Sequence, residues 1–330
     1  MQSIDLVIEN NDIRDVDSDV VILKYAQDFY GADEAVINSL NSVGINEKEA
    51  ICPPGSHRIL NTLGGIKAKK ALFLGVPELL YFNYTEIRNF TQRALYILKE
   101  YNDIQHIALT IHGPGYGLDE VESFLSILNG ILHSILLNVI PPRLRKISIV
   151  DRDSRRVINL RNALSDVDVF NSLRIPEGIR YFLDTTTQGL IIEGNYIDKM
   201  TGGSEQKPHI FVAIPFSNDF DDIFYYGIQK PVRESGYRCE RIDQNIFTGD
   251  ILDKIKQRIS TARFVIGELT GANPNVYLEI GFAWGKNIPT ILLKKKGDEL
   301  KFDVRGQRCL IYENIQDLEQ KLLRELEGLI

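Results

Sequence analysis

The chain has 330 residues with a formal net charge of −7, and hydrophobic and charged residues make up 44% and 25% of it. This length exceeds one ordinary domain and the composition is that of globular proteins, so we expect two domains. The negative net charge argues against a general nucleic-acid-binding protein.

The first part of the chain alternates strand and helix patterns. Apolar runs predict extended segments, in chain order, at 4–9, 19–25, 57–65, 70–76, 106–113 and 145–151. Helical periodicity falls between them, at 31–40, 84–101 and 119–138. Alternation of this kind predicts a mostly parallel sheet that is covered by helices.

A second α/β unit begins after a less regular stretch, residues 154–207, whose Thr-, Gly- and Ser-rich end predicts a linker. Strands are expected at 209–216, 238–243, 264–266, 288–293 and 308–313. Helices are expected around 220–235, at 250–262, from Pro274 onward and at 318–329. The predicted fold class is α/β, with two three-layer domains and mostly parallel sheets. We place them at residues 1–170 and 208–330, with a connecting segment at 171–207.

The three cysteines (Cys52, Cys239 and Cys309) form no CxxC pair, which predicts a reducing, cytoplasmic compartment. The five histidines show no metal-ligand spacing, so no metal is expected. The N-terminus reads as a strand rather than a signal peptide.

The apolar segment 123–140 is interrupted by polar residues and is short for a bilayer span. It predicts a buried helix or one face of an oligomer contact, with no membrane association.

Three loops follow strands at the carboxyl edge of the second sheet, where open parallel sheets bind ligands. They provide the candidate substrate-binding residues Phe216, Ser217, Asp243, Thr248, Glu268 and Asn275.

Glu279 is the candidate catalytic residue. Asn273 and Pro274 suit the N-cap and first position of a helix, which places Glu279 in the second turn. Small residues at Gly281, Ala283 and Gly285 are expected to let this helix lie close to the sheet. A carboxylate in an apolar notch can attack or stabilise an anomeric carbon whose bond is breaking. The pattern equally allows Glu279 only to complement the helix dipole, worth about 0.3–1 kcal/mol.

The segment GELTGANPNVYLEIGFAWGK (267–286), within residues 208–295, resembles the nucleoside 2-deoxyribosyltransferase and TIR-like superfamily, in its bacterial TIR-like branch. The resemblance implies a flavodoxin-like fold with Glu279 as the catalytic carboxylate, and places Phe216 and Ser217 in the loop that contacts base or ribose. It implies NAD as a substrate, with no bound cofactor. The transferases usually carry an aspartate where this chain has Asn273, which favours NAD cleavage over transfer.

A second candidate site lies in IHGPGYGLDEVESF (111–124), a Gly-rich turn between a strand and a helix. Its backbone amides could hold a phosphate, although a plain tight turn fits it equally. This segment, with GSHRILNTLGGIKAKKALFLGV (55–76) and the order of elements over 4–150, resembles macro-like domains of the leucine aminopeptidase N-terminal type. The resemblance implies a nucleotide such as ADP-ribose bound at Gly31, Asp33, Gly113, Gly115, Tyr116 and Gly117.

Together these features predict an NAD glycohydrolase that acts as a regulated, antiphage-type effector. Its N-terminal domain would sense a nucleotide signal or drive assembly, and the active form would be a homo-oligomer or a complex with a partner protein. Two alternatives remain open. One is a nucleoside or nucleotide 2-deoxyribosyltransferase or hydrolase, and the other is a non-catalytic nucleotide-binding receptor.

Overall fold

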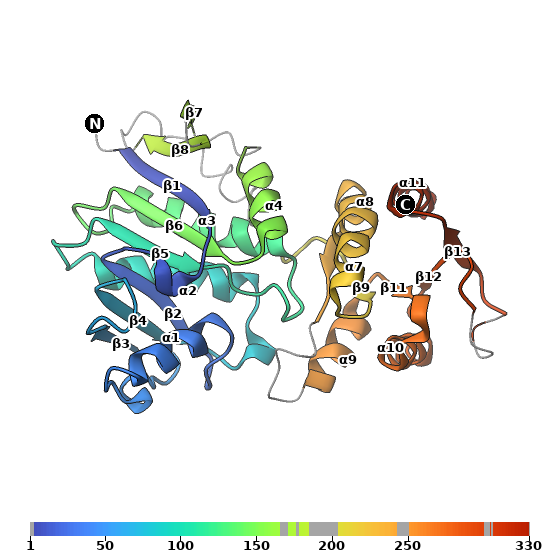
Figure 1. The fold of residues 1–330 in the computed structure, drawn as a ribbon, viewed down its shortest axis with the longest axis horizontal. Coiled ribbons are helices and arrows are strands. Elements are labelled where there is room, and N and C mark those ends of the chain that lie inside the picture. Colours follow the sequence, from blue (N-terminus) through green and yellow to red (C-terminus); the bar gives the residue numbers. More distant parts are fainter. Residues whose placement is uncertain are drawn as a thin grey trace. The chain divides into compact units, whose positions relative to one another are not determined.

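The computed structural model describes residues 3–165, 171–175, 178–184, 204–242, 251–299, 304 and 306–329 (Figure 1). It divides into two compact units. One comprises Met1–Gly113 and Glu120–Glu205, and the other comprises Pro114–Asp119 and Gln206–Ile330. Each unit is an α/β fold on a mostly parallel sheet, which confirms the predicted fold class.

The first unit contains an eight-stranded sheet in the order β3-β4-β2-β5-β6-β1-β8-β7. The strands are β1 (Ser3–Asn10), β2 (Val20–Tyr25), β3 (His57–Asn61), β4 (Lys70–Gly75), β5 (His106–Thr110), β6 (Lys146–Asp151), β7 (Asn171–Ile175) and β8 (Gly178–Asp184). The five strands from β4 to β1 in this order are parallel. Antiparallel strands complete both edges, with β3 on β4 and with β8 and β7 beyond β1.

Helices cover both faces of this sheet. They are α1 (Ala32–Asn41), α2 (Tyr84–Leu98), α3 (Glu120–Leu136) and α4 (Ser154–Ser165), with short 3₁₀ helices η1 (Ile13–Asp15), η2 (Glu47–Glu49) and η3 (Leu79–Tyr81). On one face α1 packs Val36 and Leu40 against strand residues such as Leu23. Strand residues that point the other way, such as Ile22, are equally buried. Helix α2 packs on α3, and α4 packs on α3, β1 and β6.

The apolar segment 123–140 forms most of α3, which is buried on nearly all sides. Gly130 permits close packing on α2, because a Cβ atom added there would lie 2.7 Å from Cβ of Thr91. The structure thus confirms the buried-helix interpretation of this segment. None of the helices in the described part of the chain combines the length and apolarity needed to span a bilayer.

The stretch after residue 154 is more regular than the sequence analysis expected. Helix α4 buries Val157, Leu160 and Leu164, a helical spacing that the surrounding charged residues obscured. The predicted connecting segment, 171–207, contains β7 and β8, which extend the first sheet beyond β1. Their partner strand lies at the start of the chain, so local sequence does not reveal the pairing. Most of the remaining linker, 185–203, lies outside the described residues.

The second unit contains a five-stranded, fully parallel sheet in the order β10-β9-β11-β12-β13. The strands are β9 (His209–Ala213), β10 (Arg238–Glu240), β11 (Phe264–Glu268), β12 (Thr290–Lys295) and β13 (Cys309–Tyr312). Numbered within the unit, this order is 2-1-3-4-5, that of flavodoxin-like folds.

Two helical layers enclose this sheet. One face of the sheet is covered by α7 (Asn218–Asp222), η4 (a π-helix, Ile223–Gln229), α8 (Lys230–Glu234) and α11 (Ile315–Glu327). Helices α9 (Ile251–Thr261) and α10 (Pro274–Gly285) pack on the other face of the sheet. The short helix η5 (Thr270–Ala272) leads into α10. The three-layer prediction therefore holds for this unit.

The close contact between α10 and the sheet depends on a glycine in the strand. A Cβ atom added to Gly267 of β11 would lie 2.4 Å from Cδ1 of Ile280. Gly281 and Gly285, which were expected at this contact, instead have no neighbour within 4 Å of an added Cβ. Of the three small helix residues only Ala283 is buried, so that prediction was wrong for the two glycines. Gly281 and Gly285 are four residues apart, so they share one face of the helix, and that face is exposed.

Candidate active site

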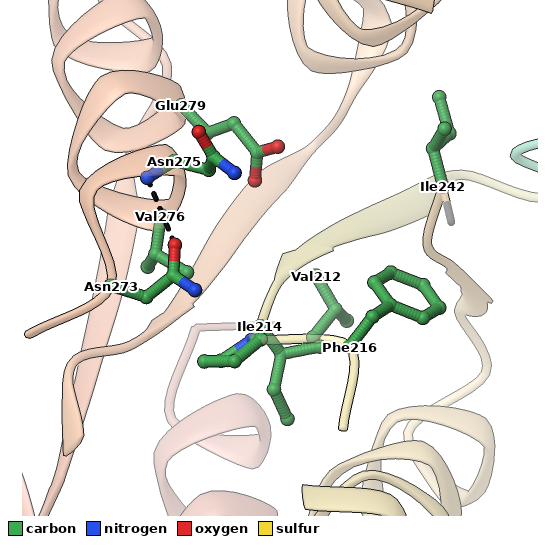
Figure 2. Close-up of a pocket in the computed structure, with 9 residues that line it drawn as sticks. Val212, Ile214, Phe216, Ile242, Asn273, Asn275, Val276 and Glu279 are labelled. Carbon is green, nitrogen blue, oxygen red and sulfur yellow. Dashed lines mark hydrogen bonds between the residues drawn. The ribbon is translucent and has the colours of Figure 1, made fainter. Parts of the chain in front are cut away.

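A cavity of about 170 Å³ opens at the carboxyl edge of the second sheet (Figure 2). It lies where the chain order reverses, because β10 flanks β9 on one side and β11 on the other. Open α/β sheets bind ligands at this switch point. The cavity is lined by Val212, Ile214, Pro215, Phe216, Ile242, Asn273, Asn275, Val276 and Glu279.

The start of α10 forms the polar wall. Asn273 caps the helix, since its side-chain oxygen accepts a hydrogen bond of 2.9 Å from the backbone N–H of Asn275. Pro274 occupies the first helical position, where its missing N–H costs nothing. Glu279 follows in the second turn with 9% of its surface exposed, and its carboxylate faces the cavity (Figure 2).

Phe216, after β9, forms the aromatic wall, and Arg241 holds it in place. The guanidinium carbon of Arg241 lies 4.6 Å from the ring centre of Phe216 and 3.8 Å from that of Phe224. Asp221 lies 3.8 Å from the same guanidinium group. Arg241 was not among the predicted site residues, because a lone arginine at a strand end carries no motif.

Ile242, two residues after the end of β10, is also a lining residue of the cavity. It forms an isolated antiparallel bridge with Tyr116, and a Cβ atom added to Gly117 would lie 3.1 Å from Cγ1 of Ile242. The carboxylate of Asp119 accepts two hydrogen bonds from Arg233, of 3.0 and 3.2 Å. The same carboxylate accepts one of 3.0 Å from the backbone N–H of Cys239.

These contacts hold Pro114–Asp119 on the edge strand of the second sheet. The predicted phosphate-binding residues are therefore distributed over both units. Gly115, Tyr116 and Gly117 belong to the second unit, whereas Gly31, Asp33 and Gly113 belong to the first. The three glycines of the turn have φ angles of 111°, 82° and 87°, which only glycine adopts freely.

Asp33 is engaged inside the first unit. Its carboxylate is 1% exposed, forms an ion pair with the ammonium group of Lys24 and accepts a hydrogen bond of 3.1 Å from the Lys24 backbone N–H. Burial raises the pKa of Asp33, and the Lys24 charge offsets part of that rise. Gly31 supplies the left-handed conformation (φ 55°) at the N-cap of α1.

Glu268 ends β11 and is fully buried, but it does not line the cavity. Its Oε1 accepts a hydrogen bond of 2.9 Å from the backbone N–H of Thr270. The Thr270 hydroxyl in turn accepts one of 3.0 Å from the backbone N–H of Lys295. Burial raises the pKa of the Glu268 carboxyl. Glu268 thus anchors the η5 turn that leads into the cap of α10.

Of the predicted second-domain residues, Phe216, Asn275 and Glu279 meet in the cavity. Ser217 caps α7 through its carbonyl, which accepts from Phe220 N at 2.9 Å, and is not a lining residue. Asp243 and Thr248 lie outside the described residues. Asn273 was predicted only as a helix cap, and five further lining residues were not predicted: Val212, Ile214, Pro215, Ile242 and Val276. Apart from Val276, which lies in α10, their position at or near the ends of β9 and β10 was the available signal.

The described residues contain no group of three or more His, Cys, Asp or Glu side chains that could hold a metal ion.

No protein-family model and no curated protein matches this chain. Similar solved structures include the Trypanosoma brucei macrodomain in complex with ADP-ribose, at 13% identity over 48% of this chain and 68% of that one, with a TM-score of 0.41. The Oceanobacillus iheyensis macrodomain with ADP is similar at 15% identity over 49% and 95%, with a TM-score of 0.38. The Clostridium botulinum CMP N-glycosidase BcmB is similar at 20% identity over 34% and 96%, with a TM-score of 0.29. All three likenesses are distant.

Proposed function

We propose that this chain cleaves the N-glycosidic bond between nicotinamide and ribose in NAD, with Glu279 as the catalytic carboxylate. The content of the cavity supports this most directly, because Glu279 is the one titratable side chain among its described lining residues. A neutral base leaves readily only when an acid protonates it. The nicotinamide ring of NAD is already cationic and leaves as a neutral molecule. A cavity whose described lining carries a single carboxylate therefore suits NAD better than a neutral nucleoside.

The proposed reaction assigns Glu279 to the anomeric carbon. As the C1′–N bond breaks, its electron pair moves to the ring nitrogen and positive charge develops on the ribose. The Glu279 carboxylate stabilises this oxocarbenium-like centre or captures it as a glycosyl ester. Water then adds to C1′, a proton is released, and the products are nicotinamide and ADP-ribose.

The test compares wild type with Glu279→Gln, which keeps the shape of the side chain and removes its charge. A charge about 4 Å from the developing cation contributes about 4 kcal/mol at an effective dielectric constant of about 20. We therefore expect nicotinamide release to fall roughly a thousandfold or more. Glu234→Gln, at an exposed position on α8, is the control and should keep wild-type turnover. Unchanged NAD turnover in Glu279→Gln would refute the assignment.

The same assay separates the alternatives. Mass spectrometry would follow NAD, deoxyuridine and dCMP, each with and without ADP-ribose as a candidate signal. Base release from the deoxynucleosides but not from NAD would favour the deoxyribosyltransferase or hydrolase. Stoichiometric binding of ADP-ribose or NAD with no product would favour the receptor. The further role as a regulated antiphage effector, active as an oligomer or with a partner, rests on the sequence resemblance, and dependence of turnover on ADP-ribose would support its regulatory part.

A further inference from the structure

We propose that the cavity is a base subsite with room for one six-membered ring, and that Ile242 sets this limit. The site would then cleave glycosides of single-ring bases and reject fused two-ring bases. This inference rests on the proposed cleavage at Glu279 and names the substrate class of that site.

The size of the cavity is the first argument. At about 170 Å³ it is close to an engineered protein cavity of about 150 Å³ that holds one benzene molecule. Sites that enclose whole drug-sized ligands measure about 300–1,000 Å³. One pyridine or pyrimidine ring therefore fits, while the ribose and phosphates must extend beyond the cavity. A purine has a second fused ring, which we expect to meet the described walls of the cavity.

The arrangement of the walls is the second argument. Phe216 offers a flat apolar surface on which an aromatic ring can stack. Glu279 faces it from α10, with Asn275 beside it (Figure 2). A base that stacks on Phe216 therefore presents its bond to ribose toward the carboxylate. Ile242 lines the cavity across from Glu279 (Figure 2), and we infer that a second ring would meet it there.

The side chains that line the cavity are packed against neighbours. A cavity limits the size of a ligand only if its walls cannot move aside. The guanidinium group of Arg241 lies 4.6 Å from the ring centre of Phe216 and packs over one face of the ring. The backbone of Ile242 pairs with Tyr116, and Gly117 lies against its side chain. Val212 belongs to β9, the strand next to β11 in the sheet. Widening the cavity would therefore disturb packed neighbours.

The test uses two substrates that differ in ring number but not in leaving-group charge. Nicotinamide mononucleotide and 7-methylguanosine 5′-monophosphate both carry a cationic base on ribose 5′-phosphate, so neither base needs a proton to leave. We expect wild type to cleave the first with a kcat/KM at least a hundredfold higher than the second. Ile242→Ala should raise the relative kcat/KM of the two-ring substrate at least tenfold, the usual scale for pocket size.

Ile255→Ala is the matched control. Ile255 is buried to a similar degree in the same core as Ile242 but does not line the cavity. It should lower stability without changing the ratio of the two substrates. An equal change in ratio for both variants would overturn the role of Ile242.

Failure of this inference can be told from failure of the proposed function. Glu279-dependent cleavage of both substrates at similar rates would overturn the ring limit and leave the glycosidase standing. If neither substrate nor NAD is cleaved, the proposed function fails. The ring limit is then decided by NMR titration of the wild-type chain with free nicotinamide and free 7-methylguanine. Equal affinity for the two bases, or binding of neither, would overturn it.

Discussion

Replacing Gly267 with alanine should push α10 away from the sheet. The new methyl group would lie 2.4 Å from Cδ1 and 2.8 Å from Cγ1 of Ile280, whose side chain is 1% exposed. Because Ile280 is buried, rotation of its side chain meets packed neighbours, and we expect the helix to shift instead. Overpacking of this kind costs about 1–3 kcal/mol. Because Glu279 precedes Ile280, the same shift moves the carboxylate, and a displacement of about 1 Å can lower kcat roughly a hundredfold.

The chain offers its own probe and control for this prediction. Trp284 is the only tryptophan, lies in α10 and donates a hydrogen bond of 2.8 Å from Nε1 to the Thr290 hydroxyl. Its fluorescence in urea therefore reports unfolding of the second unit. Gly281→Ala, on the open side of the same helix, should instead stabilise the unit by about 0.5–1 kcal/mol.

A double variant adds a further check on Gly267. Ile280→Val removes the nearest atom, Cδ1, so it should recover part of the loss in the Gly267→Ala background. The reasoning would be refuted if Gly267→Ala were as stable as wild type, or if Gly281→Ala lost as much stability.

Two further predictions concern buried carboxylates. Asp33→Asn breaks the buried pair with Lys24 and should lower the free energy of unfolding of the first unit by about 3–5 kcal/mol. The double variant Asp33→Leu with Lys24→Met should restore most of this stability. Thermal melts followed by circular dichroism would show both effects, and an unchanged melt in Asp33→Asn would contradict the prediction. Burial raises the pKa of Glu268 above its usual 4.5, so the unfolded chain ionises first as pH rises. The unfolding free energy of the second unit should therefore fall from about pH 4.5 up to the raised pKa, and Glu268→Gln should remove that contribution. An identical pH slope in the variant, followed through Trp284, would show that Glu268 is not its source.

The core strands and helices could be predicted because their patterns are local. The run KALFLG, for example, is buried along its whole length in β4 apart from its first residue. The edge strands β7 and β8 could not be predicted, since pairing with β1 is a contact between distant parts of the chain. Helix α4 could have been found from the spacing of Val157, Leu160 and Leu164.

The candidate site divides in the same way. The spacing from Asn273 to Glu279 is set within one helix, so the cap and the position of the carboxylate follow from sequence. Phe216 and Asn275 could be placed at the sheet edge by the rule that loops after parallel strands converge there. The roles of Arg241 and Ile242 depend on contacts with Phe224 and Tyr116, which no local pattern contains.

The Gly-rich turn shows how a correct local inference can leave the partner undetermined. The sequence predicts a Gly-rich turn before a helix, and Gly113, Gly115 and Gly117 adopt positive φ angles in it. Such a turn exposes backbone groups that must find partners. A phosphate could satisfy them, but so can the unpaired edge of a strand, and here Tyr116 bridges Ile242 beside the edge strand β10. An edge covered in this way is protected from pairing with other chains. The turn therefore has a structural role that requires its glycines whether or not a nucleotide also binds.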